Sequence, residues 1–136
     1  YDVILVDSTD PVGPATPLFG KDFYLDVFKK LTDEGLVVAQ GESGFLHLET
    51  QKRFLSIVQE LFPRTYIYNY NNLTYPGGMW SFLVGSKKWN PQRDFSSDRI
   101  TRFGGEFYWY NADIHRSSFS LPTFMRNELK GIGNDS

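Results

Sequence analysis

The order of apolar runs along the chain most strongly constrains the fold. Residues 2–6 (DVILV) and 36–40 (LVVAQ) are short, apolar and rich in β-branched side chains, which is typical of strands buried on both faces of a parallel sheet. Each run precedes a segment with apolar residues at helical spacing, residues 19–31 and 49–62. Because helices connect parallel strands through right-handed crossovers, this order predicts an α/β sheet.

The pattern changes after the second predicted helix. Residues 64–71 (RTYIYNYN) and 79–88 (MWSFLVGSKK) are both strand-like, and the segment NLTYPGG between them is too short for a helix. These two runs therefore predict an antiparallel hairpin at the edge of the sheet. Residues 8–18 contain three prolines and a glycine, which predict a loop, and residues 121–131 predict a short closing helix.

Composition excludes several classes of function. The 136 residues suit one domain, and a net charge of −2 with no basic stripe argues against a nucleic-acid partner. The chain has no cysteine, which excludes disulfides and thiolate chemistry and agrees with a cytoplasmic protein. No apolar run approaches the roughly 20 residues of a membrane span, so we expect no membrane association.

Polar side chains follow both predicted parallel strands. Asp7 follows the first strand, with Asp10 three positions later in DSTD, while Gln40 and Glu42 stand at the end of the second. Ligands of open α/β sheets bind beyond the carboxyl ends of the strands. An aspartate after a strand also commonly caps a turn, and this alternative remains open for Asp7 taken by itself. Asp7 and Asp10 together in a proline-rich loop favour a site.

An organic ammonium ion suits this site better than a metal. Two carboxylates could hold Mg²⁺, but Mg²⁺ also usually needs substrate phosphates, and no glycine-rich phosphate loop is present in the chain. Carboxylates pair with an ammonium ion and aromatic rings attract it; Tyr75 and Trp80 could supply these rings, whereas Phe82 is expected to pack in the hairpin. His47 and His115 are expected to make structural hydrogen bonds rather than to catalyse.

These residues resemble the polyamine aminopropyltransferases, most closely the spermidine synthases. The resemblance rests on YDVILVDSTDPVGPATPLF, QGE, FLHLE, LFP, TYPGGMWSF and WYNADIHRSSFSLP, which follow in this order from Tyr1 to about Leu129. Trp109 replaces the commoner tyrosine of the last motif, a change that we interpret as tolerated.

The resemblance implies a Rossmann-like, methyltransferase-type fold and transfer of an aminopropyl group from decarboxylated S-adenosylmethionine to putrescine, without a prosthetic group. It implies that Asp7 is the proton acceptor and that Asp10 helps to bind the diamine. The other substrate contacts that it implies are Ser8, Thr9, Gln40, Tyr75 and Trp80 on the amine side and Pro14 on the methylthioadenosine side.

The resemblance also implies that residues 1–136 are the carboxy-terminal portion of a catalytic domain. The glycine-rich nucleoside loop, the acidic residue that holds the ribose and an amino-terminal β domain are expected upstream of Tyr1, so the chain alone should bind the nucleoside poorly. We expect a homo-oligomer, or association with a chain that carries the missing half. A putrescine N-methyltransferase, a non-catalytic subunit of the same fold and a different amine acceptor remain open alternatives.

Overall fold

A four-stranded sheet with the strand order β1-β2-β4-β3 organises the computed structural model, which describes residues 1–8, 13–75 and 77–133. Strand β1 (Val3–Val6) pairs in parallel with β2 (Leu36–Gln40). Strand β4 (Met79–Ser86) runs antiparallel to both β2 and the outermost strand β3 (Arg64–Asn71). The predicted α/β sheet and its antiparallel edge hairpin are therefore confirmed.

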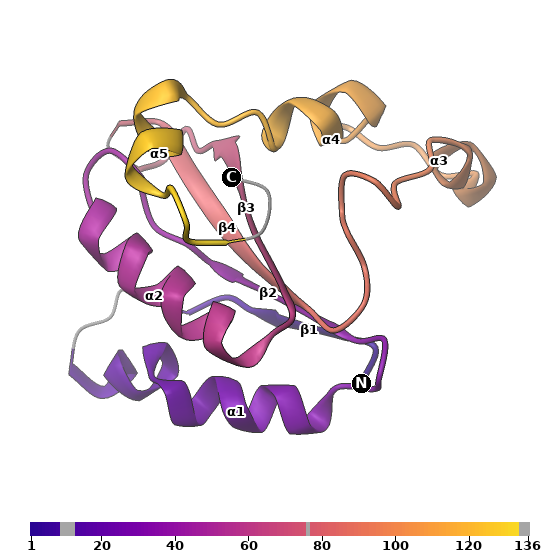
Figure 1. Cartoon of the computed structure of the whole chain (residues 1–136). Coiled ribbons are helices and arrows are strands. Elements are labelled where there is room, and N and C mark those ends of the chain that lie inside the picture. The colour runs from indigo at the N-terminus through magenta and orange to yellow at the C-terminus, as the bar shows by residue number, and fades with distance from the viewer. Residues whose placement is uncertain (9–12, 76, 134–136) are drawn as a thin grey trace.

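Two helices cover one face of the sheet, and the main core lies between them and the strands (Figure 1). Helix α1 (Lys21–Lys30) packs on α2 (Leu48–Leu61), and α2 also packs on β3 and β4. The rings of Tyr24 and Phe54 meet at the contact between the helices, with centroids 5.0 Å apart. Helix α2 ends just before Pro63, which cannot continue a helix.

Short helices follow the sheet along the chain. Helices α3 (Asp98–Phe103) and α4 (Ala112–Ser118) follow β4, and α4 contacts β3. The closing helix is confirmed as α5 (Thr123–Glu128). Among the described helices, none has the length and apolar content needed to cross a membrane.

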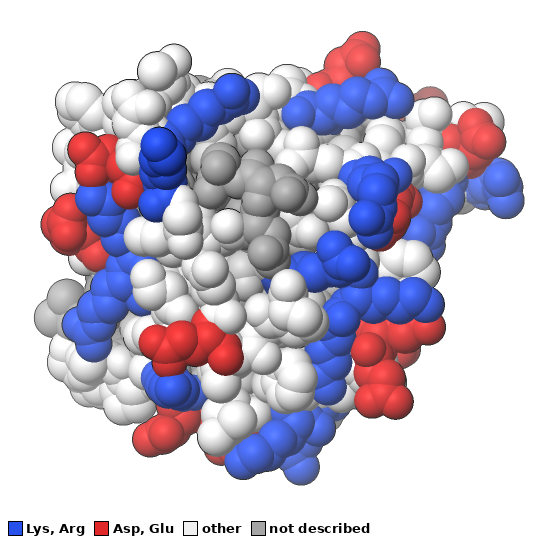
Figure 2. All heavy atoms as spheres, viewed as in Figure 1, with Lys and Arg blue, Asp and Glu red and all other residues white. Residues whose placement is uncertain are grey.

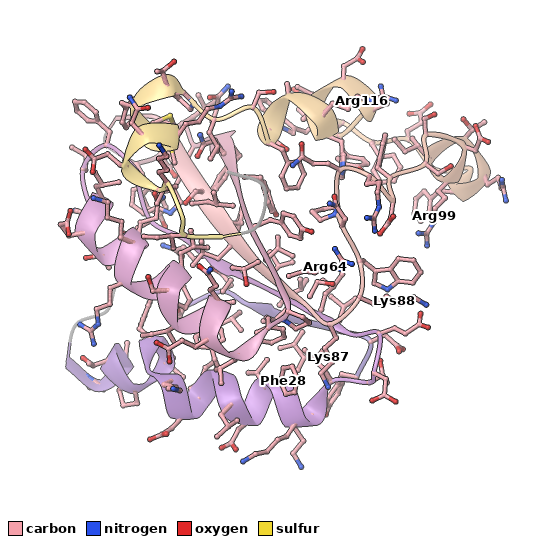
Figure 3. The ribbon with its side chains drawn as sticks, viewed as in Figure 1. Phe28, Arg64, Lys87, Lys88, Arg99 and Arg116 are labelled. Atoms are coloured by element: carbon pink, nitrogen blue, oxygen red, sulfur yellow. The ribbon has the colours of Figure 1, made fainter. Side chains whose placement is uncertain are left out.

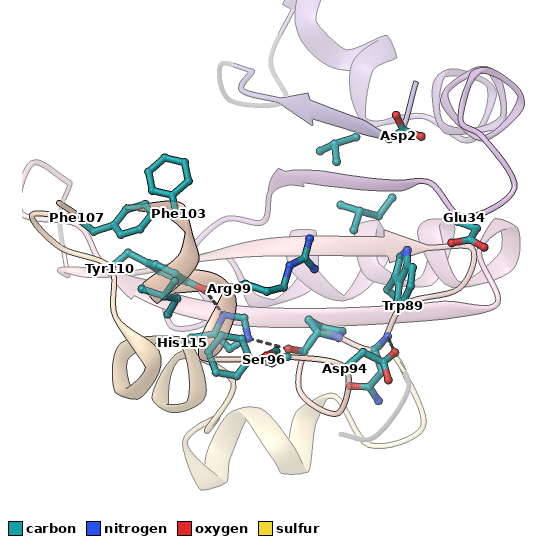
Figure 4. A pocket seen from close by; sticks show the side chains of 16 residues that line it. Asp2, Glu34, Trp89, Asp94, Ser96, Arg99, Phe103, Phe107, Tyr110 and His115 are labelled. Carbon is teal, nitrogen blue, oxygen red and sulfur yellow. Dashed lines mark hydrogen bonds between the residues drawn. The ribbon is translucent and has the colours of Figure 1, made fainter. Parts of the chain in front are cut away.

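The ring of His115 holds the segment after β4 together (Figure 4). It stacks on Phe95 with centroids 4.0 Å apart, and its Nε2 atom lies 2.7 Å from the carbonyl oxygen of Pro91. Its Nδ1 atom lies 3.0 Å from the hydroxyl of Tyr110. The expectation that His115 makes structural hydrogen bonds is confirmed.

The local structure differs from the predictions in four places. Strand β1 is not buried on both faces: Ile4 and Val6 pack against the core, whereas Val3 and Leu5 point to the opposite face and are 51% and 74% exposed. The segment predicted as a loop contains the 3-10 helix η1 (Gly13–Phe19), whose short i to i+3 turns tolerate Pro17. Helix α1 consequently begins at Lys21 rather than at Phe19. The polar segment after Trp89 contains helices α3 and α4 that were not predicted.

Candidate active site

The parallel strands bring Asp7 and Gln40 to the same end of the sheet. Val6 pairs with Ala39, and Asp7 and Gln40 come directly after these paired residues. The predicted meeting of the two strand ends is therefore confirmed. Asp7 is exposed, whereas Gln40 is buried.

The other predicted residues of the loop after β1 are only partly described. Ser8 follows Asp7 and is half-buried, and Pro14 is exposed in η1. Thr9 and Asp10 lie outside the described residues. The predicted amine contact of Asp10 therefore stays a prediction.

Glu42 carries two signs of a functional role. It is the one non-glycine residue of the described chain with a positive φ, 64°, and its side chain is buried with a residue exposure of 1%. Its Oε2 atom lies 3.1 Å from Nδ1 of His47, while its Oε1 atom has no hydrogen-bond partner among the described residues. Strained backbone and an unsatisfied buried carboxylate oxygen are both costly, and they cluster at functional sites.

An aromatic pair lies next to His47. The rings of Tyr75 and Trp80 have centroids 4.8 Å apart. The His47 imidazole and Trp80 form a T-shaped contact with centroids 6.3 Å apart. His47 therefore links Glu42 to the two rings that the sequence predicted together. Trp80 is buried at 6% exposure, and Tyr75 is 46% exposed.

Phe82 packs within the hairpin, as expected. Its ring stacks on Tyr70 with centroids 4.7 Å apart and lies 5.4 Å from the ring of Tyr68. Burial raises the pKa of the Tyr68 hydroxyl to about 12. These aromatic residues therefore form a packed layer on the sheet.

Two cavities lie away from these polar groups. One of about 550 Å³ is lined by Asp2 and Glu34, which precede β1 and β2, and thus lies at the opposite end of the sheet (Figure 4). The other, of about 500 Å³, lies between the aromatic layer and α4. Neither is lined by Asp7, Gln40 or Glu42. We therefore locate the candidate site at the convergent polar and aromatic groups and not at either cavity, because a cavity alone does not indicate which reaction a protein catalyses.

Metal ligands do not gather in the described part of the chain. No cluster of three or more histidine, aspartate or glutamate residues that could hold a metal ion occurs within residues 1–8, 13–75 and 77–133. The carboxylate of Glu42 is paired with an imidazole that meets the ring of Trp80. Carboxylates and aromatic rings both attract organic cations.

Two lysine side chains that follow β4 have local partners. Figure 2 shows lysine and arginine side chains interspersed with acidic ones on one face. Lys87 lies over the ring of Phe28, with Nζ 4.2 Å from the centroid, and donates a hydrogen bond to the carbonyl oxygen of Leu31 (Figure 3). Lys88 pairs with Glu34. These lysines attach the end of β4 to α1 and to the turn before β2.

The comparison with protein families identifies the chain. The sequence model of the spermine/spermidine synthase domain matches residues 1–97. The chain belongs to the spermine/spermidine synthase domain family. Curated relatives of this family member include a polyamine aminopropyltransferase of Shouchella clausii, 44% identical over 131 residues, and one of Bacillus subtilis, 42% identical over 130 residues. Each alignment covers 96% of the chain but 46% of the relative, so the chain spans about half the length of these relatives.

Solved structures of the family match the fold closely. A spermidine synthase in complex with the transition state analogue AdoDATO superposes with a TM-score of 0.90 at 36% identity, covering 95% of this chain and 44% of that one. The spermidine synthase of Thermotoga maritima gives a TM-score of 0.87 at 36% identity, covering 95% and 43%. The Rossmann-like fold expected from the resemblance is confirmed. The family member described here corresponds to part of each of these two structures.

Sequence reasoning located Glu42 near the strand ends but missed the contacts around it. His47 was expected to make a structural hydrogen bond, and it does, but its partner is the strained carboxylate residue itself. The tripeptide QGE directly after a predicted strand was the available signal. The positive φ and the burial of Glu42 required the tertiary structure.

Proposed function

We propose that the protein transfers an aminopropyl group from decarboxylated S-adenosylmethionine to putrescine, giving spermidine and methylthioadenosine. The observation that carries this proposal is the meeting of Asp7, Gln40 and the Glu42–His47 pair at the carboxyl ends of β1 and β2. The names of the relatives, polyamine aminopropyltransferase and spermidine synthase, support it.

Asp7 is proposed to act as the general base. The carbon under attack is next to a positively charged sulfur, so it needs no further activation. The attacking amine, however, has a pKa of about 10 and is protonated at neutral pH. Asp7 takes one proton from the ammonium group; the nitrogen then forms the new C–N bond as the C–S bond breaks, and sulfur leaves as a neutral thioether. The exposure of Asp7 lets the proton pass on to solvent.

The remaining groups are proposed to hold and align the diamine. The Oε1 atom of Glu42, which has no partner among the described residues, would accept a hydrogen bond from an ammonium group. The rings of Tyr75 and Trp80 would attract the same cation. Gln40 offers a buried amide beside Asp7. Correct alignment of nitrogen, carbon and sulfur can lower the activation barrier by roughly 7–11 kcal/mol in favourable cases. We therefore assign several groups to alignment of the diamine and one, Asp7, to proton transfer.

The loop after β1 completes the proposed amine site. Ser8, Thr9 and Asp10 are proposed to contact the diamine, and Pro14 to line the methylthioadenosine side; these four roles come from the family resemblance. The groups that bind the rest of the nucleoside are proposed to belong to the portion of the relatives that this chain does not match. A cytoplasmic location and a homo-oligomeric assembly are also proposed from the family resemblance.

Mass spectrometry of the reaction products tests the proposal. The full-length protein is incubated with putrescine and either decarboxylated or ordinary S-adenosylmethionine. We expect spermidine only with the decarboxylated nucleoside. Methylation of putrescine by ordinary S-adenosylmethionine would identify an N-methyltransferase instead. Absence of any heat of putrescine binding in calorimetry would indicate a non-catalytic subunit.

A further inference from the structure

The backbone at Glu42 is held in a conformation that it would not adopt by itself. Its φ of 64° lies in the left-handed region, which costs free energy for any residue with a side chain. Such a conformation persists only where the surroundings enforce it. The contacts around Glu42 therefore identify what enforces it.

Two fully buried side chains from other elements hold this turn. Nε2 of Gln51, on α2, donates hydrogen bonds to the carbonyl oxygen of Gly41 at 3.2 Å and to Oγ of Ser81 at 2.9 Å. The hydroxyl of Ser81, on β4, donates in turn to the carbonyl oxygen of Glu42 at 2.8 Å. Gln51 and Ser81 are each 0% exposed. The network thus ends on the main chain of the strained residue itself.

Close packing prevents the turn from relaxing. A Cβ atom added to Gly41 would lie 2.7 Å from Oγ of Ser81, and one added to Gly44 would lie 2.7 Å from Cε of Met125. The amide group of Gly41 also donates a hydrogen bond to the carbonyl oxygen of Ser81, at 2.9 Å. The turn is therefore fixed from α2, β4 and α5 together.

We infer that Gln51 and Ser81 are positioning residues for the amine site: they fix the main chain of Gly41 and Glu42 so that the free carboxylate oxygen of Glu42 is kept ready for the ammonium ion. Neither residue touches the substrate in this inference. The inference rests on the proposed function, in which Glu42 binds the amine. It predicts that loss of the network weakens amine binding through Glu42.

Steady-state kinetics of the full-length protein test this inference with Gln51→Leu, Glu42→Gln and the double variant. Gln51→Leu removes both hydrogen bonds of Nε2 and should raise the KM for putrescine about tenfold, with kcat and the KM for the nucleoside within about twofold. Glu42→Gln should raise the same KM. The double variant should add less than about twofold to the effect of Glu42→Gln, because both changes remove the same interaction.

Thr65→Val is the control for loss of a buried polar group, because the Thr65 hydroxyl has no hydrogen-bond partner among the described residues. Thr65 is a buried polar residue near the start of β3, 0% exposed like Gln51, and pairs with Gly85 at the opposite end of the sheet from Gln40. Its replacement should leave the KM for putrescine unchanged even if thermal stability falls. If Gln51 had only a structural role, the KM for putrescine would be unchanged in Gln51→Leu, as in Thr65→Val.

The outcomes separate this inference from the proposed function. An unchanged KM for putrescine in Gln51→Leu overturns the inference. A KM increase in the double variant equal to the product of the two single increases also overturns it. If Gln51→Leu does not fold, Ser81→Ala is measured in its place with the same expectation, since it removes the donor to the Glu42 carbonyl oxygen. If the unmodified protein binds no putrescine in calorimetry, the proposed function fails and the inference fails with it. Binding of putrescine combined with unchanged variants overturns the inference alone.

Discussion

His47 and Glu42 form an ion-pair geometry in which Nδ1 of the imidazole lies 3.1 Å from a carboxylate oxygen that is almost completely shielded from water. The imidazole itself is half exposed, with a side-chain exposure of 51%. His47 therefore connects the buried carboxylate to solvent on one side and to the ring of Trp80 on the other. It fixes the direction of one carboxylate oxygen and leaves the second available.

Replacement of His47 should weaken amine binding more than it slows the reaction. In His47→Ala the buried carboxylate loses its hydrogen-bonded partner, so it has more freedom to turn, and we expect the KM for putrescine to rise about fivefold to tenfold. His47→Asn keeps a polar group close to the position of Nδ1 and should restore part of the affinity. Equal affinity of the two variants, measured by calorimetry with putrescine, would contradict this role.

Replacement of Asp7 should act on turnover instead. Asp7→Asn keeps the size of the side chain but removes its ability to accept a proton, and loss of a general base typically costs about 10²–10⁴ in rate. We expect kcat to fall by this range with a modest change in putrescine affinity. Asp33→Asn, at an exposed aspartate before β2, is the control and should keep normal turnover. A kcat of Asp7→Asn within a few-fold of the unmodified protein would remove the general-base assignment.

Tyr75 should contribute to binding through its ring. Because a partly exposed aromatic face attracts a cation by about 0.5–2 kcal/mol, Tyr75→Ala should weaken putrescine binding by roughly threefold to thirtyfold. Tyr75→Phe keeps the ring and should retain most of the affinity. Tyr108→Ala is the matched control, because Tyr108 is a fully exposed tyrosine, at 104% exposure, in a different segment. Comparable losses for Tyr75→Ala and Tyr108→Ala would contradict a specific contact.

His115 should matter for stability and not for chemistry. His115→Ala removes the stacking contact with Phe95 and leaves the carbonyl oxygen of Pro91 without its imidazole donor. We expect the free energy of unfolding in urea to fall by about 1–3 kcal/mol, with normal kcat at a temperature where the variant is folded. Loss of activity in fully folded His115→Ala would show that this histidine has a further role.

Tyr68 should make the fold sensitive to alkaline pH. Its hydroxyl has a pKa of about 12 in the folded state against 10.0 for an ordinary tyrosine, because burial disfavours the phenolate. The stabilising contribution is therefore complete below pH 10 and is lost as the pH rises from 10 towards 12. Chemical unfolding at a series of pH values should show this decline, and Tyr68→Phe should reduce its slope. An unchanged slope would mean that Tyr68 ionises equally easily in both states.

The sequence predicted the parts of the fold that depend on long, regular patterns. The strands at 36–40 and 64–71 and the helix at 49–62 agree with the structure to within a residue or so. Helices α3 and α4 were missed because they are short and largely exposed, so apolar periodicity does not mark them. Asn111 accepts hydrogen bonds from the main chain of Asp113 and Ile114, and this N-cap was the one local signal for α4.

The residues at the strand ends of the candidate site were predictable from the sequence, but the backbone conformation of Glu42 was not. Asp7 and Gln40 follow apolar runs, so topology alone brings them together. The sequence could not reveal that Glu42 has a positive φ, because this depends on Gln51 and Ser81, which are distant along the chain. Burial of β1 was overestimated because an apolar run does not show whether other elements cover both faces of the strand.

The contact between Gly44 and Met125 has a consequence for biosynthesis. Met125 is fully buried, and a Cβ atom on Gly44 would collide with its methyl group. On the ribosome, the sheet strands and the turn after β2 emerge long before α5 does. The turn can reach its final packing only when Met125 has left the exit tunnel, so we expect the turn to settle after the strands of the described sheet have been synthesised.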